Sequence, residues 1–573
     1  MKKLVECVPN ISEGRDPAII EAVTDVIKEV AEVRLLDVDP GADTNRTVIT
    51  FIGSPAGVSE AAFRVVAKAA QVIDMSKHSG AHPRHGATDV CPFVPVSGVT
   101  MADCVVIARE VAERIGRELA IPVYCYEEAA LRPERQNLAH VRQGEYEALA
   151  DKLGKPEWKP DFGPDQWNEQ VARTGVTNVG ARQFLVAYNV NLNTRQKKIA
   201  TDIALDVKEA GRAKRDAQGK FVRDADGQVI NVPGKYKLDA CKAVGWIIPE
   251  YDRAQISINL VNTAITKPHQ AFEACRAGAR DRGVRVTGSE LVGLIPEADM
   301  LAAGKHYLRQ ANQSTGIPKR QIIATAIQSM GLDELSPFDP LDKIIEYQAG
   351  FVDGPLVKMS NREFVDELSS DSPAPGGGSV AALCAAQAAG LCAMVANLTV
   401  GKQKYGSVQD RVKVIAETCQ QDKDFFLAAI DEDTDSFNAV MDCFRLPKTS
   451  GAQQRERDLA IAAATRGATL VPLGVLERIP PLLGLVAETA RIGNANSLSD
   501  AGVAALAAMA GAEGAYYNVL INLASLAELD QSADPQFPVT ARERAVTALA
   551  LCEESAAAAR ASVREKLESA LDV

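Results

Sequence analysis

The sequence predicts an α+β multidomain protein, in which two α/β subdomains with mixed sheets are followed by an all-α helical bundle. Two observations carry this prediction. Up to about residue 350, short β-branched runs such as 33–38 and 47–52 alternate with stretches of helical period such as 17–30 and 55–73, which is typical of α/β layers. Beyond residue 360, Ala- and Leu-rich segments of helical period replace these runs, which favours a bundle.

The length of 573 residues exceeds a single core and fits several domains. We expect an N-terminal subdomain over 1–184, a second subdomain over 185–349, a linker over 350–357 and a helical domain over 358–573. Residues 211–238 are polar and rich in turn signals. They are therefore predicted to form a surface hairpin or a mobile excursion.

Composition argues against several classes of protein. A formal net charge of −12 disfavours a general nucleic-acid binder, which needs a cationic surface. The 11 cysteines are scattered without a CxxC pair, which predicts free thiols in a reducing compartment. No signal peptide is recognisable, so a cytoplasmic location is expected. The uncharged stretch 379–400 is too weakly apolar for a membrane span and is predicted to be a buried helix.

Three of the six histidines, His78, His82 and His85, lie close together. Gly80 and Pro83 disfavour a regular helix between them, so the imidazoles are expected on a loop. Histidine exchanges a proton near neutral pH and could act as an acid or base here. A metal site and a solvated loop are the alternatives, although the spacing of the three residues suits a metal only on a helix.

Asp39 and Arg46 flank a turn between two predicted strands. A carboxylate at this position can orient an imidazole. A guanidinium can bind a substrate carboxylate through two parallel hydrogen bonds. An ordinary turn made of turn-forming residues is the alternative.

One acid falls on the apolar face of the helix predicted over 411–444. With Phe426 at 0°, Phe437 lies at about 20°, Val440 at about −40° and Asp433 at about −20°. Desolvation raises the pKa of such a carboxyl group, which can then exchange a proton near neutral pH. A structural ion pair is the alternative. The neighbouring acids are expected to be solvated: Asp431, Glu432 and Asp435.

A glycine turn precedes the Ala-rich helix. Gly376, Gly377 and Gly378 end this turn, and Ser379 stands at the start of the helix. Free amides at a helix N-terminus can hold an anion or a polarised carbonyl. A flexible linker is the alternative.

Longer motifs give the sequence a family resemblance. They lie at 4–14, 44–48, 82–84, 89–93, 161–164 and 180–182 in the first half, and at 444–448, 493–497 and 518–522 in the second. Through them nearly the whole chain resembles the formimidoyltransferase-cyclodeaminase family.

The resemblance implies a bifunctional folate enzyme. One activity would transfer a formimino group from N-formimino-L-glutamate to N5 of tetrahydrofolate. The other would release ammonia from 5-formiminotetrahydrofolate and close the ring to 5,10-methenyltetrahydrofolate. His82 matches the catalytic histidine of the transferase and Asp433 the catalytic aspartate of the cyclodeaminase. A homo-oligomer is implied, with polyglutamylated tetrahydrofolate as co-substrate and no metal, nucleic-acid or membrane partner.

The resemblance also implies where substrates bind. Segment 161–182 resembles the folate-binding loop, with contacts at Gly163, Pro164, Asp165 and Gly175. Trp158 or Trp167 could stack on the pteridine, or simply pack against the domain. The turn 376–379 belongs to the second site, and Lys402 and Lys404 are candidate contacts for anionic tails. Two rival functions remain: a metal-dependent lyase that uses His78, His82 and His85, and a non-catalytic folate-binding scaffold.

Overall fold

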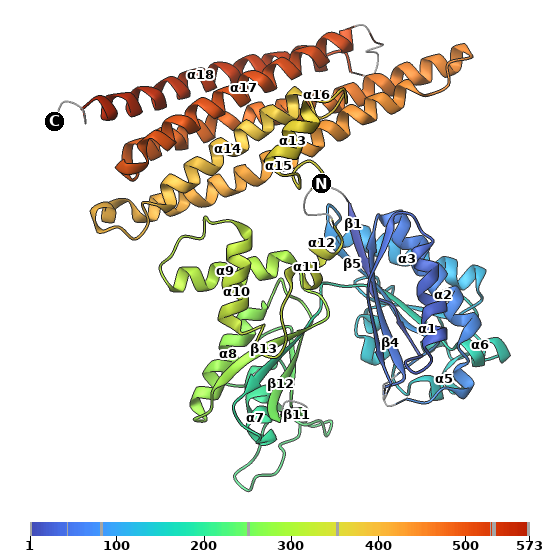
Figure 1. The fold of residues 1–573 in the computed structure, drawn as a ribbon. Helices are drawn as coiled ribbons and strands as arrows, with labels where there is room; N and C mark the ends of the chain where they lie inside the picture. The colour runs from blue at the N-terminus through green and yellow to red at the C-terminus, as the bar shows by residue number, and fades with distance from the viewer. Residues whose placement is uncertain are drawn as a thin grey trace. The chain divides into compact units, whose positions relative to one another are not determined.

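The computed structural model describes residues 3–42, 44–80, 84–248, 252–350, 354–527, 529 and 534–569. The chain divides into two compact units, one made of residues 1–299 and 330–349, the other of residues 300–329 and 350–573. The first unit contains the sheets, and the described part of the second is helical (Figure 1). The predicted fold class is confirmed. Residues 300–329 lie inside the predicted second subdomain but belong to the helical unit.

Seven strands form the first sheet. Their order is β1-β4-β2-β5-β7-β6, and β3 pairs with the other side of β4. The β5–β7 and β6–β7 pairs are parallel and the remaining pairs are antiparallel, so the sheet is mixed. The strands are β1 (Leu4–Cys7), β2 (Asn10–Ile11), β3 (Val33–Gly41), β4 (Arg46–Gly53), β5 (Thr88–Ser97), β6 (Val123–Glu127) and β7 (Thr177–Ala181).

Three amphipathic helices cover one face of this sheet (Figure 1). They are α1 (Pro17–Lys28), α2 (Pro55–Val72) and α3 (Met101–Glu118), and each begins after a side chain that caps its first turn. Alternate side chains of the strands enter the core beneath them, so the intervening side chains point to the opposite face. Short helices complete the unit: α4 (Leu138–Val141), α5 (Leu149–Lys152), α6 (Glu169–Thr174), α11 (Pro340–Lys343) and α12 (Ile345–Gln348).

The second sheet has four strands in the order β11-β12-β8-β13, and all its pairs are antiparallel. Its strands are β8 (Val186–Leu192), β11 (Cys241–Ile248), β12 (Arg253–Leu260) and β13 (Val286–Val292). Two helices pack against it: α7 (Lys197–Val207) on β11 and β12, and α8 (Pro268–Asp281) on β8 and β13.

The predicted polar excursion is a hairpin. Its base pairs β9 (Arg212–Ala213) with β10 (Asn231–Val232). Two turns of the same design follow within it, because the side chains of Asp216 and Asp224 each accept two backbone N–H bonds from residues two and four positions later. This repetition explains how a segment without an apolar core holds a defined shape.

Long helices make up the second unit: α13 (Asn361–Leu368), α14 (Gly377–Asn397), α15 (Gln409–Phe444), α16 (Gly451–Ile492), α17 (Leu498–Ala527) and α18 (Phe537–Ser569), together with α10 (Lys319–Met330) and α9 (Glu297–Gln310) from residue 300 onward. Their core is rich in alanine, and such small side chains let helices pack closely. Lys305 and Thr315 bond to Glu417 of α15 at 2.6 and 3.2 Å and tie residues 300–329 to the bundle.

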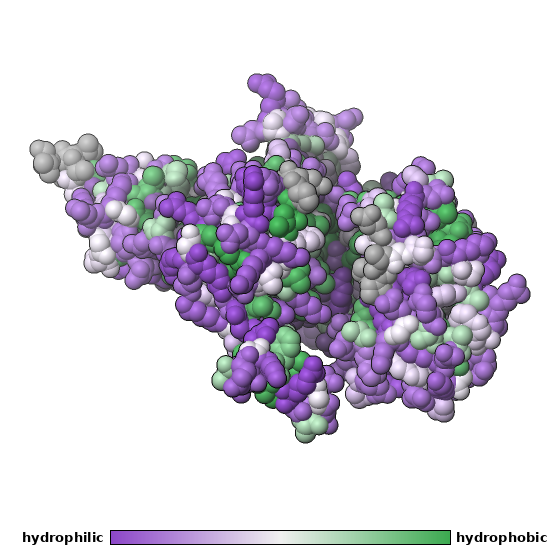
Figure 2. Space-filling view, turned by 90° about the horizontal axis from the view of Figure 1, so that it is seen from below, coloured by the Kyte–Doolittle hydropathy of each residue, from purple (hydrophilic) through white to green (hydrophobic). Residues whose placement is uncertain are grey.

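Two helices, α14 and α16, are long and apolar enough to cross a membrane by length and composition alone. However, 61% of the apolar window of α14 and 50% of that of α16 are buried inside the protein. α14 packs against α15, α16 and α17, as expected for a core helix. The surface in Figure 2 is mainly hydrophilic, with separate hydrophobic patches, which is ordinary for a globular protein.

Candidate active sites

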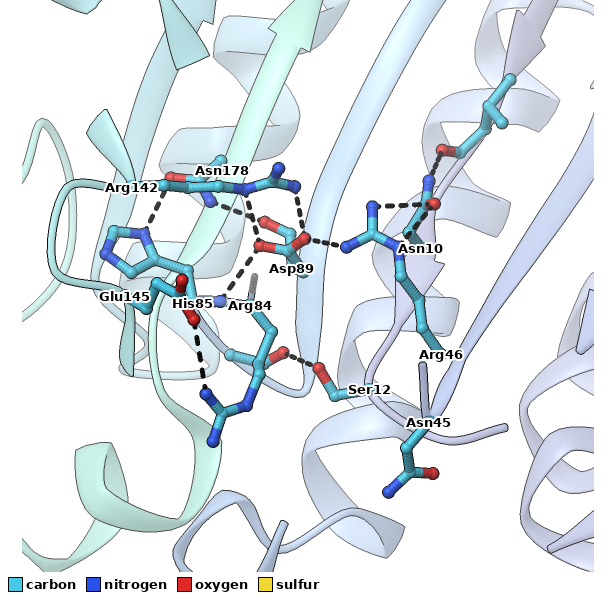
Figure 3. A network of polar contacts seen from close by, with 12 residues as sticks. Asn10, Ser12, Asn45, Arg46, Arg84, His85, Asp89, Arg142, Glu145 and Asn178 are labelled. Atoms are coloured by element: carbon cyan, nitrogen blue, oxygen red, sulfur yellow. Dashed lines mark hydrogen bonds and ion pairs between the residues drawn. The ribbon is translucent and has the colours of Figure 1, made fainter. Parts of the chain in front are cut away.

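A buried carboxylate organises the loop region of the first sheet. Asp89, at the start of β5, is 0% exposed. It accepts hydrogen bonds from Arg46, from Nε of Arg142 at 3.1 Å and from the backbone N–H of His85 at 3.1 Å (Figure 3). Arg142 also donates a second bond through Nη2. Two guanidinium groups therefore compensate one desolvated carboxylate, the condition under which a buried charge is tolerated.

Arg46 takes part in this network rather than pointing freely toward a ligand. The β3–β4 register opposes Gly41 to Arg46 and so places it at the start of β4. Besides Asp89, its guanidinium bonds to Oδ1 of Asn10 through Nε at 3.1 Å and Nη2 at 2.9 Å (Figure 3). Burial lowers the pKa of Arg46. The predicted substrate clamp is thus held by internal partners, and binding by it stays a prediction.

His82, the predicted transferase catalyst, lies outside the described residues. Asp39, its predicted orienting partner, is exposed on β3 opposite Val48. Burial raises the pKa of the neighbouring Asp37, and the charge of Asp39 adds to this effect. The pairing of Asp39 with His82 stays a prediction.

The two neighbouring histidines, His78 and His85, are both held by protein partners. Nε2 of His78 lies 2.9 Å from the carbonyl oxygen of Asn45, and Arg84 donates to its Nδ1 at 3.2 Å. His85 is buried, its Nδ1 lies 3.2 Å from Oδ1 of Asn178, and burial lowers its pKa to about 4. Both rings are therefore anchored as neutral groups near pH 7. Because both nitrogens of His78 have protein partners, His78 does not fit the metal ligand of the rival interpretation.

Sequence reasoning missed Asp89, Arg142 and Asn178 as site residues. Asp89 did carry a signal, because an acid at the start of an apolar strand is unfavourable without partners. Arg142 and Asn178 carried none. They reach Asp89 only through the tertiary fold, Asn178 by donating to its carbonyl oxygen at 2.7 Å.

Segment 161–182 is not the continuous loop that the resemblance implied. It contains α6 and strand β7, which lies between β5 and the edge strand β6. Gly163, Pro164 and Asp165 follow a bridge between Val123 and Phe162. Gly175 ends α6 with a φ of 64°, and a Cβ there would overlap the carbonyl oxygen of His85. Gly175 therefore lies directly against the backbone of His85 and Gly86, and its contact with folate stays a prediction.

Both tryptophans near this segment contact protein side chains. Trp158 stacks on His140 with ring centroids 5.7 Å apart, and Nζ of Lys152 lies 3.7 Å from its ring centroid. Trp167 lies tilted against Tyr146 at 5.9 Å and is 36% exposed. The packing alternative therefore describes both rings in this structure.

In the helical unit, Asp433 lies where α15 meets the N-terminus of α14. The hydroxyl oxygen of Ser379 is 3.2 Å from Oδ2 of Asp433 and 2.8 Å from the carbonyl oxygen of Ile430. Desolvation raises the pKa of Asp433, and hydrogen bonds from the hydroxyl and backbone N–H of Ser379 oppose this rise. No described Arg or Lys pairs with it, so the ion-pair alternative does not describe this carboxyl group.

The glycine turn lies directly against this carboxyl group. A Cβ at Gly378 would lie 2.6 Å from Oδ2 of Asp433 and closer still to Oδ1, whereas a Cβ at Gly377 would lie 3.3 Å from Nδ2 of Asn518. Gly376 is the N-cap of α14. The structure thus brings Gly376, Gly377, Gly378 and Ser379 together with Asp433, as a helix N-terminus facing an acid.

Two expectations for α15 are wrong. Asp431 is not simply solvated, because its carboxylate accepts the backbone N–H groups of Leu356 at 2.9 Å and Val357 at 3.3 Å. The apolar face predicted over 411–444 is buried at Phe426 and Ile430, but it does not stay buried to the end of the helix, because Phe444 is 48% exposed. Helical periodicity identifies the apolar face of α15. It does not tell over what length of that face other helices pack.

Lys402 and Lys404 lie far from Asp433 of the same chain. Both are exposed and follow the C-terminus of α14. Gly378 lies at the other end of this 21-residue helix, which at 1.5 Å per residue is about 30 Å away. Instead, Nζ of Lys404 lies 5.7 Å from the ring centroid of Tyr405, whose hydroxyl accepts the N–H of Ala495 at 3.0 Å.

Comparison with known proteins assigns these parts of the chain. Family models match residues 4–182 (formiminotransferase domain, N-terminal subdomain), 187–350 (formiminotransferase domain) and 360–541 (formiminotransferase-cyclodeaminase). The formimidoyltransferase-cyclodeaminase of Mus musculus is 40% identical over 92% of this chain and 94% of its own length. The chain belongs to the formimidoyltransferase-cyclodeaminase family. The resemblance drawn from the sequence motifs is confirmed.

Members with a single module are also similar. The glutamate formimidoyltransferase of Streptococcus pyogenes serotype M1 is 42% identical over 54% of this chain and 94% of its own length. A crystal structure of formiminotetrahydrofolate cyclodeaminase from Thermotoga maritima is 27% identical, covers 37% of this chain and 98% of that chain, and has a TM-score of 0.31. This member of the family is a bifunctional enzyme. The Asp89 network lies in its transferase module and Asp433 in its cyclodeaminase module.

Proposed function

We propose that this enzyme transfers the formimino group of N-formimino-L-glutamate to N5 of tetrahydrofolate, and then converts 5-formiminotetrahydrofolate to 5,10-methenyltetrahydrofolate and ammonia. The observation that carries the proposal is the sheltered, hydrogen-bonded carboxyl group of Asp433 at the N-terminus of α14, in a chain whose family members are named for both activities.

In the transferase step, N5 attacks the amidine carbon and loses a proton, while the departing glutamate nitrogen gains one. His82 serves as the base and then as the acid. His78 and His85 support this role, because as neutral, anchored side chains they fix the chain on both sides of His82 in the sequence. Arg46 and Asp39 stay the candidates for substrate contacts beside it.

In the cyclodeaminase step, N10 closes on the formimino carbon and ammonia leaves. Asp433 donates a proton to the departing nitrogen. A raised pKa suits this task, because it keeps the group protonated in a larger fraction of molecules near neutral pH. We assign to the amides of the turn 376–379 the role of polarising the substrate.

We further propose polyglutamylated tetrahydrofolate as the co-substrate, a homo-oligomeric assembly and a cytoplasmic location. The exposed lysines Lys402 and Lys404 suit anionic tails. Exposed apolar side chains of the bundle, such as Phe444 and Tyr517 at 48% and 62%, suit contacts between copies.

Separate assays of the two half-reactions test the assignments. His82→Ala is expected to abolish formimino transfer but to leave ring closure on supplied 5-formiminotetrahydrofolate unchanged. Asp433→Asn is expected to do the reverse. Methenyltetrahydrofolate is followed by absorbance and ammonia is measured independently. Retention of the wild-type rate by either variant in its own half-reaction would refute that residue's role. Chelator-sensitive activity with stoichiometric metal would favour the lyase alternative.

A further inference from the structure

The transferase module contains a buried carboxyl group that the proposed chemistry leaves unused. Glu6 lies on β1 between Val5 and Cys7, which both enter the core beneath α1–α3. Its side chain therefore points to the opposite face of the sheet. Glu6 is only 3% exposed, and its carboxylate has no hydrogen-bond or ion-pair partner among the described residues.

The same face carries the site residues already described. Asn10 and Arg46 also alternate with core positions, so they share the face of Glu6. Along β4, Glu6 lies opposite Ile52 and Asn10 lies opposite Val48. This four-residue separation corresponds to about 13 Å along the sheet. Glu6 thus lies on the same face of the sheet as the Asp89 network, four positions along β4 from Asn10.

Two charged groups face Glu6. Arg182 follows β7 and lies in the same row of the sheet, because its N–H donates to Phe93 and Glu6 pairs with the next residue, Val94. Glu346 belongs to α12, which packs over the neighbouring positions of the sheet. Burial raises the pKa of Glu6 to about 7, Arg182 opposes this rise and Glu346 adds to it.

We propose that the Glu6 carboxylate binds the cationic formamidinium group of the formimino donor. An unpartnered, desolvated carboxylate requires a cation that brings its own hydrogen-bond donors. A formamidinium is planar and presents two N–H groups side by side, which match the two carboxylate oxygens as a guanidinium does. The other substrate offers no such cation, because N5 must react as a neutral amine. The N3–H and 2-amino group of its pterin ring form a donor pair of the same shape, but this pair is neutral and leaves the charge of the carboxylate uncompensated.

The pairing also has a chemical use. A carboxylate that stabilises the cation keeps the amidine protonated, and the carbon of the protonated form is the more electrophilic. The inference rests on the proposed transferase function and assigns one contact within it.

The inference predicts that donor binding is linked to a proton. A cation beside Glu6 lowers its pKa. At pH 7, where about half of the Glu6 groups carry a proton, each bound donor therefore releases about half a proton. For the same reason KM for the donor rises about tenfold per unit as the pH falls below 7.

Glu6→Gln tests this, because it keeps the shape of the side chain and removes its charge. KM for N-formimino-L-glutamate is expected to rise about ten- to a hundredfold, while KM for tetrahydrofolate and the ring-closure rate stay unchanged. Calorimetric titration with the donor alone, in two buffers of different ionisation enthalpy, should show proton release in the wild type and none in the variant.

Glu346→Gln is the matched control. It retains Glu6 but removes a charge that raises its pKa, so the rise of donor KM should persist and move to lower pH. A wild-type donor KM or undiminished proton release in Glu6→Gln overturns the inference alone, provided that the wild type transfers the formimino group. A wild-type chain without transferase activity overturns the proposed function together with it.

Discussion

At the scale of single residues, the network around Asp89 is built from polar groups that are buried as neutral or charge-compensated species. Asp89 is matched by two arginines, and His85 is held uncharged between Asn178 and Tyr124. The sequence indicated that the histidines of this segment mattered, but not that two of them anchor the loop. Anchoring depends on partners such as Asn178, 93 positions further along the chain.

His85 makes the stability of this module depend on pH. Its pKa falls from 6.5 to about 4 on folding, so between these values the unfolded chain holds a proton that the folded chain lacks. His85 should therefore lower the free energy of unfolding by about 1.4 kcal/mol per pH unit as the pH drops from 6.5 toward 4. Glu6, whose pKa rises from 4.5 to about 7 on folding, opposes this slope between pH 7 and 4.5, so the contribution of His85 is the difference between the wild type and His85→Gln. Urea unfolding followed by tryptophan fluorescence measures it, because Trp158, Trp167 and Trp246 all lie in the first unit.

His85→Gln should remove the contribution of His85, so the free energy of unfolding of the variant should gain about 1.4 kcal/mol per pH unit relative to the wild type as the pH drops from 6.5 toward 4, even though the variant is less stable at pH 7. If its slope between pH 6.5 and 4 equals that of the wild type, other groups cause the dependence.

At the scale of elements, the candidate cyclodeaminase site lies where the N-terminus of α14 packs against the side of α15. Helical period alone was enough to place Asp433 on the face of α15 that meets α14, because 100° per residue is a local property of the backbone. It did not reveal the closeness of α14 to α15, which requires the absence of a Cβ at Gly378.

Gly378→Ala should therefore reduce ring closure at least tenfold, because the added methyl group displaces the Asp433 carboxylate, and it should leave formimino transfer unchanged. Gly390→Ala on the same helix is the control, since its Cβ meets nothing within 4 Å. Both substitutions raise helix propensity by about 1 kcal/mol, so a difference between them isolates the overlap. Equal ring-closure rates in the two variants would show that the carboxylate tolerates displacement.

At the scale of the whole molecule, the change from mixed to helical sequence pattern near residue 350 predicted two kinds of architecture. It could not assign residues 300–329 to the helical unit. Their contacts, such as Asn397 to the carbonyl oxygen of Gly316 at 2.7 Å and Lys305 to Glu417, join residues 80 to 110 or so positions apart. Periodicity reports which face is apolar, whereas such polar contacts depend on the folded chain.

In a fragment that begins at residue 354, α15 should therefore form but be locally less stable than in the full chain. Without Lys305 and Thr315, amide hydrogens around Glu417 should exchange faster in the fragment than in the full chain, while those in the middle of α17 should not change. Equal protection of α15 in the two proteins would show that residues 300–329 do not stabilise it.

The repeated turns of the 211–238 hairpin have a practical consequence. Gln218 is exposed at one tip, and most native cysteines are buried. A thiol introduced there by Gln218→Cys would react selectively with a maleimide dye or a surface linker. Single enzyme molecules could then be tethered and observed through successive turnovers, because the label on the 211–238 hairpin lies outside both sheets.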